Sequence, residues 1–237
     1  MPRRFTARFA ESAGDLRRAQ ALRGQVFRQG QADEDGFDTR CRHVLVEDGF
    51  EGRLACTFRI QPFENGAGIS RSYAAQFYEL SALKGYEGRL VEMGRFCIDP
   101  RNKNPDILRT AWGAMTAYVD DHNVKMLFGC SSFHGAEAEA HLEAFALLKA
   151  RHLAPRKFLP QIKAPRVFRF ARLMRTPNLR AAQHAMPPLL RTYLAMGGWT
   201  SDHAVVDRDL NTLHVFTGLE IGAIPAARKR LLRAMAE

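Results

Sequence analysis

The sequence contains no run of about 18 or more apolar residues, so it offers no segment long enough to span a membrane as a helix. Its first residues, MPRRFTARFAE, lack the apolar stretch of a secretory signal. The four cysteines lie far apart and form no C-x-x-C pair, which disfavours a zinc site and favours small buried thiols. We therefore expect a cytoplasmic protein, in a reducing compartment, with no metal site.

Acidic residues are missing from one block of fifty residues. Between Arg151 and Thr200 there are ten lysines and arginines and no aspartate or glutamate, and the other 25 basic residues balance the 25 acidic ones. The whole formal net charge of +10 therefore lies in this block. Such a surface suits an acidic protein, a phospholipid surface or nucleic acid, or it is simply solvated. No nucleic-acid recognition motif accompanies the charge, so we expect no nucleic acid partner.

The chain is long enough to bury a full core, because it has 237 residues of which 46% are hydrophobic. We expect one domain over residues 1–237, with a basic amphipathic insertion or extension at about 153–186. Apolar periodicity and helix-start and helix-stop residues predict helices over 15–28, 71–83, 106–122, 137–152, 166–175, 187–196 and 226–235.

Strand patterns alternate with these helices. Apolar and β-prone runs predict strands at 41–47, 54–61, 90–100, 125–132 and 213–219, with the first two as a hairpin and residues 201–212 as a loop. The strand–helix–strand–helix order in the middle of the chain implies a parallel pair within a mixed sheet. The predicted fold class is therefore an α/β (α+β) sandwich.

The stretch LVEMGRFCIDP, residues 90–100, is β-prone but contains Glu92 and Arg95. A buried charge must pair, meet a ligand or line a cavity. Residues three apart on a regular strand point to opposite faces, and a β-bulge near Gly94 would return these two side chains to one face. We expect a split central strand with a polar site at its break.

Two further features carry unexpected charge. Arg23 falls on the inward face of the first predicted helix, where it either pairs with a carboxylate or points into a site. The polar loop that follows, residues 29–39, is a candidate cation-binding element, although acidic loops are usually just solvated. Its acidic residues are Asp33, Glu34, Asp35 and Asp38.

The order of elements resembles the GCN5-related N-acetyltransferase (GNAT) fold. In that fold a bulge splits the fourth strand, and the fourth and fifth strands splay apart to admit the donor's pantetheine arm. Residues 90–100 would be the fourth strand and 125–132 the fifth. The coenzyme A signature R/Q-x-x-G-x-G/A is absent, since Arg101-Asn-Lys-Asn-Pro-Asp106 stands in its place.

The first hundred residues are similar to the acyl-carrier-protein-dependent branch of this fold, which includes acyl-homoserine lactone synthases. The tryptophan that those synthases carry after the first helix is missing from residues 29–32. The matching residues are Arg23 and Phe27 in Arg-x-x-x-Phe, Asp35 and Asp38 in Asp-x-x-Asp, Arg59 in the third strand, and Glu92, Arg95 and Phe96 in Glu-x-x-Arg-Phe.

Nearly the whole chain resembles the bacterial ornithine N-acyltransferases of ornithine-lipid synthesis. The matching stretches are DGFDTRCRHVLV, EMGRFCIDP, MLFGCSSFHG and PPLLRTYLAMGGWTSDHAVVDRDLNTLHVF. This resemblance implies transfer of a 3-hydroxyacyl chain from 3-hydroxyacyl-acyl carrier protein to the α-amine of L-ornithine, which gives lyso-ornithine lipid. The donor is then the phosphopantetheine arm of the carrier protein, and no bound cofactor is expected.

Amide formation needs a deprotonated amine beside a thioester carbonyl and donors for the developing oxyanion. Glu92 is the first choice for the general base, through a water, and a buried ion pair with an arginine is its alternative. The backbone N–H groups of Gly94, Arg95 and Phe96 are the expected oxyanion donors. His134, at the end of the fifth strand, is the candidate acid for the leaving thiolate, or only a local hydrogen-bonding group.

The remaining residues of the pattern are candidates for binding the acceptor. Asp35 and Asp38 are predicted to hold the side-chain ammonium of ornithine, while Arg59 or Arg95 holds its carboxylate. Arg23 and Phe27 complete this predicted substrate site. Alternatively, a purely structural network that positions the loop is formed by Arg23, Asp35, Asp38 and Arg95.

The basic block is predicted to dock an acidic carrier protein, an anionic membrane surface, or both. We expect peripheral contact with the inner membrane. Two other functions stay open: a lactone synthase that uses S-adenosylmethionine, and a non-catalytic basic membrane-binding protein. The residues assigned to this patch are Arg166, Arg169, Arg172 and Arg175.

Overall fold

The computed structural model describes residues 3–236, whose contacts divide the chain into two compact units. The first unit contains the residues up to Pro62, the segment Met93–Val124 and the residues from Ala226 on. The second contains Phe63–Glu92 and Lys125–Pro225. The boundary falls inside strand β5 (Arg89–Ile98), directly after Glu92.

The first unit is built on an antiparallel sheet in the order β1–β2–β3, with β5 next to β3. These strands are β1 (Phe5–Phe9), β2 (Arg42–Asp48) and β3 (Arg53–Phe63). The predicted hairpin of β2 and β3 is confirmed, with Val44 opposite Phe58 and Leu45 opposite Thr57. Strand β1 was not predicted, because five residues with only one buried side chain give a weak alternating pattern.

Strand β5 departs from regular strand geometry at Arg95, next to Gly94, and the predicted β-bulge itself stays a prediction. Arg95 adopts φ 53°, in the left-handed region that a residue with a Cβ rarely enters. Such a conformation costs about 1–3 kcal/mol and persists only when surrounding contacts hold it. The predicted splaying of the fourth and fifth strands stays a prediction.

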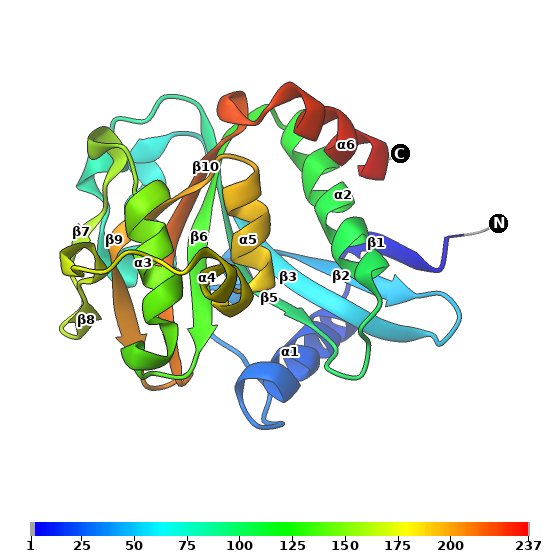
Figure 1. The fold of residues 1–237 in the computed structure, drawn as a ribbon. Coiled ribbons are helices and arrows are strands. Elements are labelled where there is room, and N and C mark those ends of the chain that lie inside the picture. The colour runs from blue at the N-terminus through cyan, green and yellow to red at the C-terminus, as the bar shows by residue number, and fades with distance from the viewer. Residues whose placement is uncertain (1–2, 237) are drawn as a thin grey trace. The chain divides into compact units, whose positions relative to one another are not determined.

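The helices of the first unit begin where the sequence supplies caps. Ser12 Oγ accepts a hydrogen bond from Asp15 N at 3.1 Å, and Asn104 Oδ1 accepts one from Asp106 N at 2.9 Å. The elements are α1 (Ala13–Phe27), the 3₁₀ turn η1 (Asp38–Arg40), α2 (Pro105–Asp121) and α6 (Ala226–Ala236). Helices α2 and α6 lie side by side (Figure 1), and Gly113 permits this because a Cβ there would lie 2.4 Å from Met235 O.

The second unit has a four-strand antiparallel array in the order β6–β10–β9–β8. A separate two-stranded pair joins β4 to β7. The strands are β4 (Tyr78–Glu79), β6 (Val124–His134), β7 (Gln161–Ile162), β8 (Val167–Phe168), β9 (Trp199–Asp207) and β10 (Thr212–Glu220).

Helices and 3₁₀ turns complete the second unit. Figure 1 shows α3, α4 and α5 gathered on one face of the β6–β10–β9 sheet. They are α3 (Leu142–Arg151), α4 (Leu179–Ala185) and α5 (Pro188–Ala195). The 3₁₀ turns are η2 (Gly66–Arg71), η3 (Ala74–Gln76), η4 (Ser81–Leu83), η5 (Ala138–His141), η6 (Arg156–Phe158), η7 (Phe170–Arg172) and η8 (Ile221–Ala223).

Alternate residues of β10 belong to two different hydrophobic clusters. Leu213 and Val215 pack with Phe145 of α3, while Phe216 packs with Phe128 and residues of the η2–η4 segment. A sheet buried on both faces explains why the strands of this unit appear as nearly continuous apolar runs. None of the helices between residues 3 and 236 has the length and apolar character needed to cross a bilayer.

Two predicted helices are wrong. Residues 71–83 form short turns and strand β4, because the backbone pairs with β7 and the Tyr78 hydroxyl donates a hydrogen bond to His214 O at 2.7 Å. Residues 166–175 form β8 and η7 instead of a basic amphipathic helix. There Phe168 pairs with Ala204 of β9, and the Phe170 ring stacks on Phe145 with centroids 5.1 Å apart. In both segments tertiary contacts override local propensity.

Residues 201–212 were predicted as a loop, whereas β9 extends to Asp207. The polar run Thr200–His203 looks like a loop, but Ser201 supplies hydrogen bonds inside the sheet. Its Oγ donates to His203 O at 2.7 Å and accepts from Phe216 N at 3.1 Å, where the β9–β10 register shifts. Helix α4 was also missed. The helices at 15–28, 106–122, 187–196 and 226–235 are confirmed within a few residues.

Candidate functional site

Arg23 is fully buried on α1, and the chain after this helix folds back to reach it. Gly24 permits the return, because a Cβ there would lie 2.0 Å from Gln31 O. Gln29 and Gly30 take left-handed conformations, with φ 52° and 94°, and so reverse the chain. Asp33 N then donates to Gln20 O at 3.2 Å, which fixes the acidic loop against the helix.

The Arg23 guanidinium joins two aspartates of that loop. Its Nε and Nη2 both lie 2.8 Å from Asp33 Oδ2, and its Nη1 lies 2.7 Å from Asp38 Oδ1. All three side chains are buried. The unexpected charge on the inward face of the first helix is therefore a buried ion pair, the pairing alternative of the sequence analysis.

Arg59 of β3 and Arg95 of β5 continue the same cluster. Arg59 forks onto Asp35 with Nη1–Oδ1 2.6 Å and Nη2–Oδ2 2.8 Å, and its Nη1 also lies 2.6 Å from Asp38 Oδ1. Arg95 donates from Nε to Asp33 Oδ2 at 2.9 Å and from Nη2 to Asp35 Oδ2 at 3.2 Å. These ion pairs hold the left-handed Arg95 in place. We call Arg23, Asp33, Asp35, Asp38, Arg59 and Arg95 the aspartate–arginine network.

Three positive and three negative charges cancel within this network, so each buried charge has a compensating partner. Burial opposes ionisation of Asp38, yet hydrogen bonds from Arg23, Gln20 and Arg59 outweigh it and lower the pKa of its carboxyl below the ordinary value. The pKa of Asp33 and that of Asp35 are lowered in the same way, against burial, by the neighbouring arginines. The three carboxyls are therefore ionised at neutral pH.

The network is most accessible at Asp35. Its side chain is 23% exposed, compared with 8% for Arg95 and 4% for both Asp38 and Arg59. Asp38 is enclosed by five donor atoms, which belong to Gln20, Arg23, Arg59 and the Asp35 backbone. Asp35 also has four donors, from Arg59, Arg95 and the Phe37 backbone, but its greater exposure makes it the acid of the network that is most open to a ligand cation.

The aromatic members of the pattern have less specific contacts. Phe96 stacks on Phe58 of β3, with ring centroids 5.5 Å apart and 25° between planes. Phe27 ends α1 and is half-buried. Their role in substrate binding stays a prediction.

Glu92 lies in the second unit and is 4% exposed. Its Oε2 accepts a hydrogen bond from Tyr73 N and its Oε1 accepts one from Ala74 N, both at 2.7 Å. Consecutive N–H groups at the start of a 3₁₀ turn form a cradle for an anion, and η3 begins at this point. Because no sequence pattern links residues 73 and 74 to Glu92, this contact was not foreseen. A general-base role for Glu92 stays a prediction.

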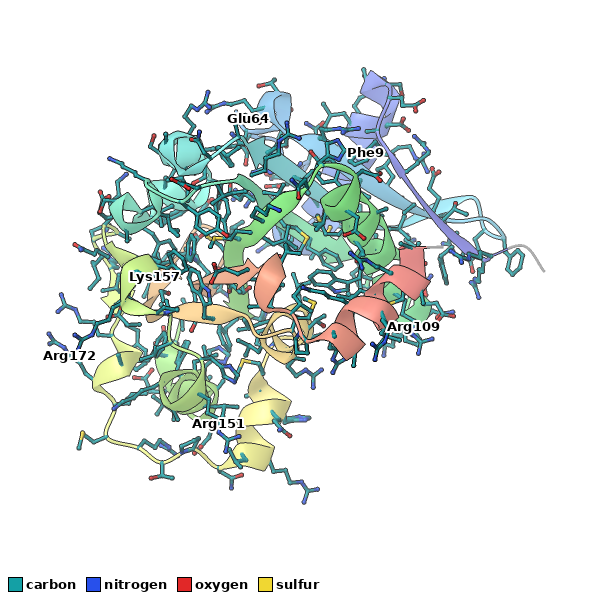
Figure 2. The ribbon with its side chains drawn as sticks, turned by 90° about the horizontal axis from the view of Figure 1, so that it is seen from above. Phe9, Glu64, Arg109, Arg151, Lys157 and Arg172 are labelled. Carbon is teal, nitrogen blue, oxygen red and sulfur yellow. The ribbon has the colours of Figure 1, made fainter. Side chains whose placement is uncertain are left out.

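His134 is the last residue of β6 and is exposed; its carbonyl oxygen lies 3.0 Å from His141 Nε2. Each arginine of the predicted patch is exposed as well. The positive charge of Arg175 is neutralised by Glu143, whose Oε1 lies 2.9 Å from Arg175 Nε. Figure 2 shows the Arg172 side chain pointing away from the ribbon.

The sequence missed Asp33 as a partner of the arginines, although it named Asp33 in the acidic loop. Asp33 Oδ2 receives both Arg23 and Arg95, and Asp33 Oδ1 lies 3.2 Å from Arg28 Nε. The available signal for this role of Asp33 was that the loop contains more carboxylates than an Asp-x-x-Asp pattern requires. Asp35, Asp38, Arg23, Arg59 and Arg95 do come together, whereas the predicted membership of Glu92 in the same constellation stays a prediction.

Comparison with known proteins gives a consistent result. Residues 18–113 match the acetyltransferase (GNAT) domain family. The chain is 31% identical to an L-ornithine N(α)-acyltransferase of Rhodobacter capsulatus, over 94% of this chain and 92% of that one. It is also 31% identical to an L-ornithine N(α)-acyltransferase of Brucella abortus, over 92% of this chain and 84% of that one.

A solved structure supports the fold alone. An N-acyl amino acid synthase from uncultured soil microbes superposes with a TM-score of 0.54 at 13% identity, covering 98% of this chain and 97% of that one. The predicted fold class, a mixed α/β architecture of GNAT type with a largely antiparallel sheet flanked by helices, is confirmed.

Proposed function

Since this chain belongs to the L-ornithine N(α)-acyltransferase family, we propose that it transfers a 3-hydroxyacyl chain from acyl carrier protein to the α-amine of L-ornithine. The product would be lyso-ornithine lipid. Family membership makes the chain an N-acyltransferase. The acceptor, the donor and the residue roles are the proposed parts.

The observation that carries the proposal is the length of the similarity. The 31% identity extends over 94% of this chain, so it includes the acidic loop, β5 and the basic block together. A shared acetyltransferase fold alone would not point to an acceptor, because folds host many functions. A relative that matches over nearly its whole length is a more specific guide to the acceptor.

The aspartate–arginine network suits an amino acid with two ammonium groups and one carboxylate. We propose that the side-chain ammonium of ornithine meets the Asp35 carboxylate, the most exposed acid of the network. Arg95, or Arg59 behind it, would attract the α-carboxylate. Asp38 supports this arrangement by holding Arg23 and Arg59 in place. The α-amine would then be the nucleophile.

Direct aminolysis accounts for all atoms without an acyl-enzyme. The α-ammonium of ornithine loses one proton to Glu92 through a water, and the amine nitrogen attacks the thioester carbonyl carbon. The oxyanion that forms would be stabilised by backbone N–H groups of Gly94, Arg95 and Phe96. When the C–S bond breaks, the nitrogen loses its second proton to water, and the thiolate gains one proton from His134 or from water.

The carrier protein would approach the basic patch. Carrier proteins of this kind are acidic, and exposed arginines such as Arg169 and Arg172 would steer and orient them. Because the proposed product is a lipid, peripheral contact of the chain with an anionic membrane surface is part of the same proposal.

Incubation of the purified chain with 3-hydroxyacyl-acyl carrier protein and L-ornithine, followed by mass spectrometry, tests the proposal. We expect a product with the mass of one hydroxyacyl group joined to ornithine, and fragmentation that locates the amide on the α-nitrogen. Parallel reactions with S-adenosylmethionine, lysine or glutamine as acceptor, and with acyl-coenzyme A as donor, serve as comparisons. Acylation of S-adenosylmethionine and not of ornithine would sink the proposal.

A further inference from the structure

Met174 is exposed to solvent, although the residues on both sides of it are fixed by contacts with α3. Its side chain is 96% exposed, although it is large and apolar. The preceding Leu173 packs on the α3 cluster, and its carbonyl oxygen accepts a hydrogen bond from Lys149 Nζ at 2.5 Å. On the other side Glu143 pairs with Arg175 and accepts from Asn178 N at 2.7 Å. The loop of residues 173–178, called here the Met174 loop, therefore presents Met174 outward without gaining any packing from it.

Helix α4 follows the loop and adds a second apolar side chain and a basic cavity. Leu179, its first residue, is 43% exposed, while Ala182 on its inner side is fully buried. A surface cavity of about 560 Å³ opens between α4 and α5. It is lined by Asn178, Arg180, Ala181, Gln183, His184 and Arg191.

The arginines that line this cavity have no acidic residue beside them in its lining. No aspartate or glutamate occurs between Arg151 and Thr200, and Glu143 already neutralises Arg175. Arg180 and Arg191 thus face the cavity with donors for an anion, and the Asn178 and Gln183 amides add polar groups beside them. A phosphate ester has the charge and the acceptor oxygens that such a site recognises.

We infer that the Met174 loop and the α4 cavity form a membrane-docking element that binds anionic phospholipid. Met174 and Leu179 enter the boundary between headgroups and acyl chains, and Arg180 and Arg191 hold a headgroup phosphate. Apolar side chains flanked by arginines are the pattern of interfacial membrane binding, whereas contact with an acidic protein uses the charges and leaves Met174 without a partner. The inference rests on the proposed function for the presence of a lipid product, and it names the surface that meets the bilayer.

Sedimentation with sucrose-loaded vesicles of phosphatidylcholine, with and without phosphatidylglycerol, measures the binding. We expect the chain to bind the anionic vesicles and not the neutral ones. Replacing both cavity arginines, Arg180→Gln with Arg191→Gln, removes two basic charges, each worth about fivefold in binding, so the partition coefficient should fall about 25-fold. Met174→Gln should lower it about tenfold, since a methionine side chain loses its apolar insertion.

Matched controls come from the first unit. Phe50→Gln removes another exposed apolar side chain, 72% exposed in the β2–β3 turn, and should leave vesicle binding unchanged. Arg17→Gln with Arg109→Gln removes two exposed arginines and lowers the net charge by the same amount. If this control pair weakens vesicle binding as much as the cavity pair does, the binding follows net charge and the inference is wrong.

The remaining outcomes separate this inference from the proposed function. Acylation is assayed in parallel without vesicles, on soluble substrates. Product formation without vesicle binding overturns the inference alone, and vesicle binding without product overturns the proposed function alone. If inorganic phosphate raises the Tm of the protein but the protein does not bind anionic vesicles, the cavity binds free anions and the inference is overturned. If the cavity pair, Arg180→Gln with Arg191→Gln, raises KM for the carrier protein and leaves vesicle binding unchanged, the surface binds that protein. This result also overturns the inference.

Discussion

Replacing Asp38 by asparagine separates the two roles that the aspartate–arginine network can have. The substitution keeps the size of the side chain and removes one negative charge from a site where five donors converge. The amide would offer one acceptor oxygen, and its NH₂ group would face N–H donors of Arg23 or Arg59. The variant therefore leaves a buried positive charge without compensation.

The expected loss of stability is large. Removing one partner of a buried ion pair costs about 3–5 kcal/mol, because the other charge stays buried and unpaired. Both arginines involved, Arg23 and Arg59, are buried, so water cannot take the place of the carboxylate. For a protein of this length each kcal/mol lowers Tm by roughly 2–4 °C, so Asp38→Asn should lower Tm by roughly 6–20 °C.

Urea unfolding and thermal melting, followed by circular dichroism, measure this loss. The matched control is Glu34→Gln, an exposed acid of the same loop, for which we expect a change of less than about 0.5 kcal/mol. The pH dependence gives a second reading. The folded-state pKa of Asp38 lies below its unfolded value, so its stabilisation is complete above the unfolded pKa, about 4, and is lost as pH falls through the folded pKa. The stability gap between wild type and variant should therefore narrow in acid.

One result would refute this reasoning. If Asp38→Asn keeps the stability of the wild type and raises only KM for ornithine, the Asp38 carboxylate is a ligand of the acceptor ammonium and not a support of the network. Loss of stability with a normal KM in the surviving folded fraction supports the structural role.

Three further predictions concern other parts of the molecule. Glu92→Gln should lower kcat by about 10²–10⁴-fold in a thiol-release assay on the folded fraction, and an unchanged rate there would contradict a general-base role for Glu92. Gly24→Ala should cost about 1–3 kcal/mol in urea unfolding, because its Cβ would lie 2.0 Å from a loop carbonyl oxygen, whereas Gly14→Ala, whose nearest atom is 3.5 Å away, should be neutral or stabilising. Charge reversal at Arg169 and Arg172 should raise KM for the carrier protein, an effect that fades with added salt; equal KM values at low salt would mean a solvated surface.

The constellation was predictable because buried charges are rare enough to be noticed. Arg23 on an apolar helix face and Arg95 in a β-prone run each require a partner on electrostatic grounds alone. Which aspartate pairs with which arginine was not predictable. Whether Arg95 meets Asp33, Asp35 or Asp38 depends on the reversal at Gln29 and Gly30, and on a left-handed Arg95, neither of which has a periodic signature.

The errors in the fold have a common cause. Helices with periodic apolar faces, such as α2, were found because the local signals decide the structure there, although the N-cap of α2 is Asn104 and not Asp106, from which the helix was predicted to start. Residues 166–175 and 71–83 contain helix-compatible residues whose partners lie far away in the sequence. Phe170 stacks on Phe145, and Tyr78 bonds His214, so the decisive contacts are long-range and invisible to a local pattern.

The Glu92 contact changes how its charge must be explained. The sequence predicts a general base or an ion pair with an arginine for Glu92, and the structure adds two backbone N–H donors, at Tyr73 and Ala74. These roles do not compete, because a carboxylate has about four lone-pair sites and the two bonds use one on each oxygen. A base must also be held still relative to its substrate. The η3 cradle therefore fixes the orientation of Glu92, and Glu92→Gln, whose amide has no basicity, tests whether the carboxylate also accepts a proton.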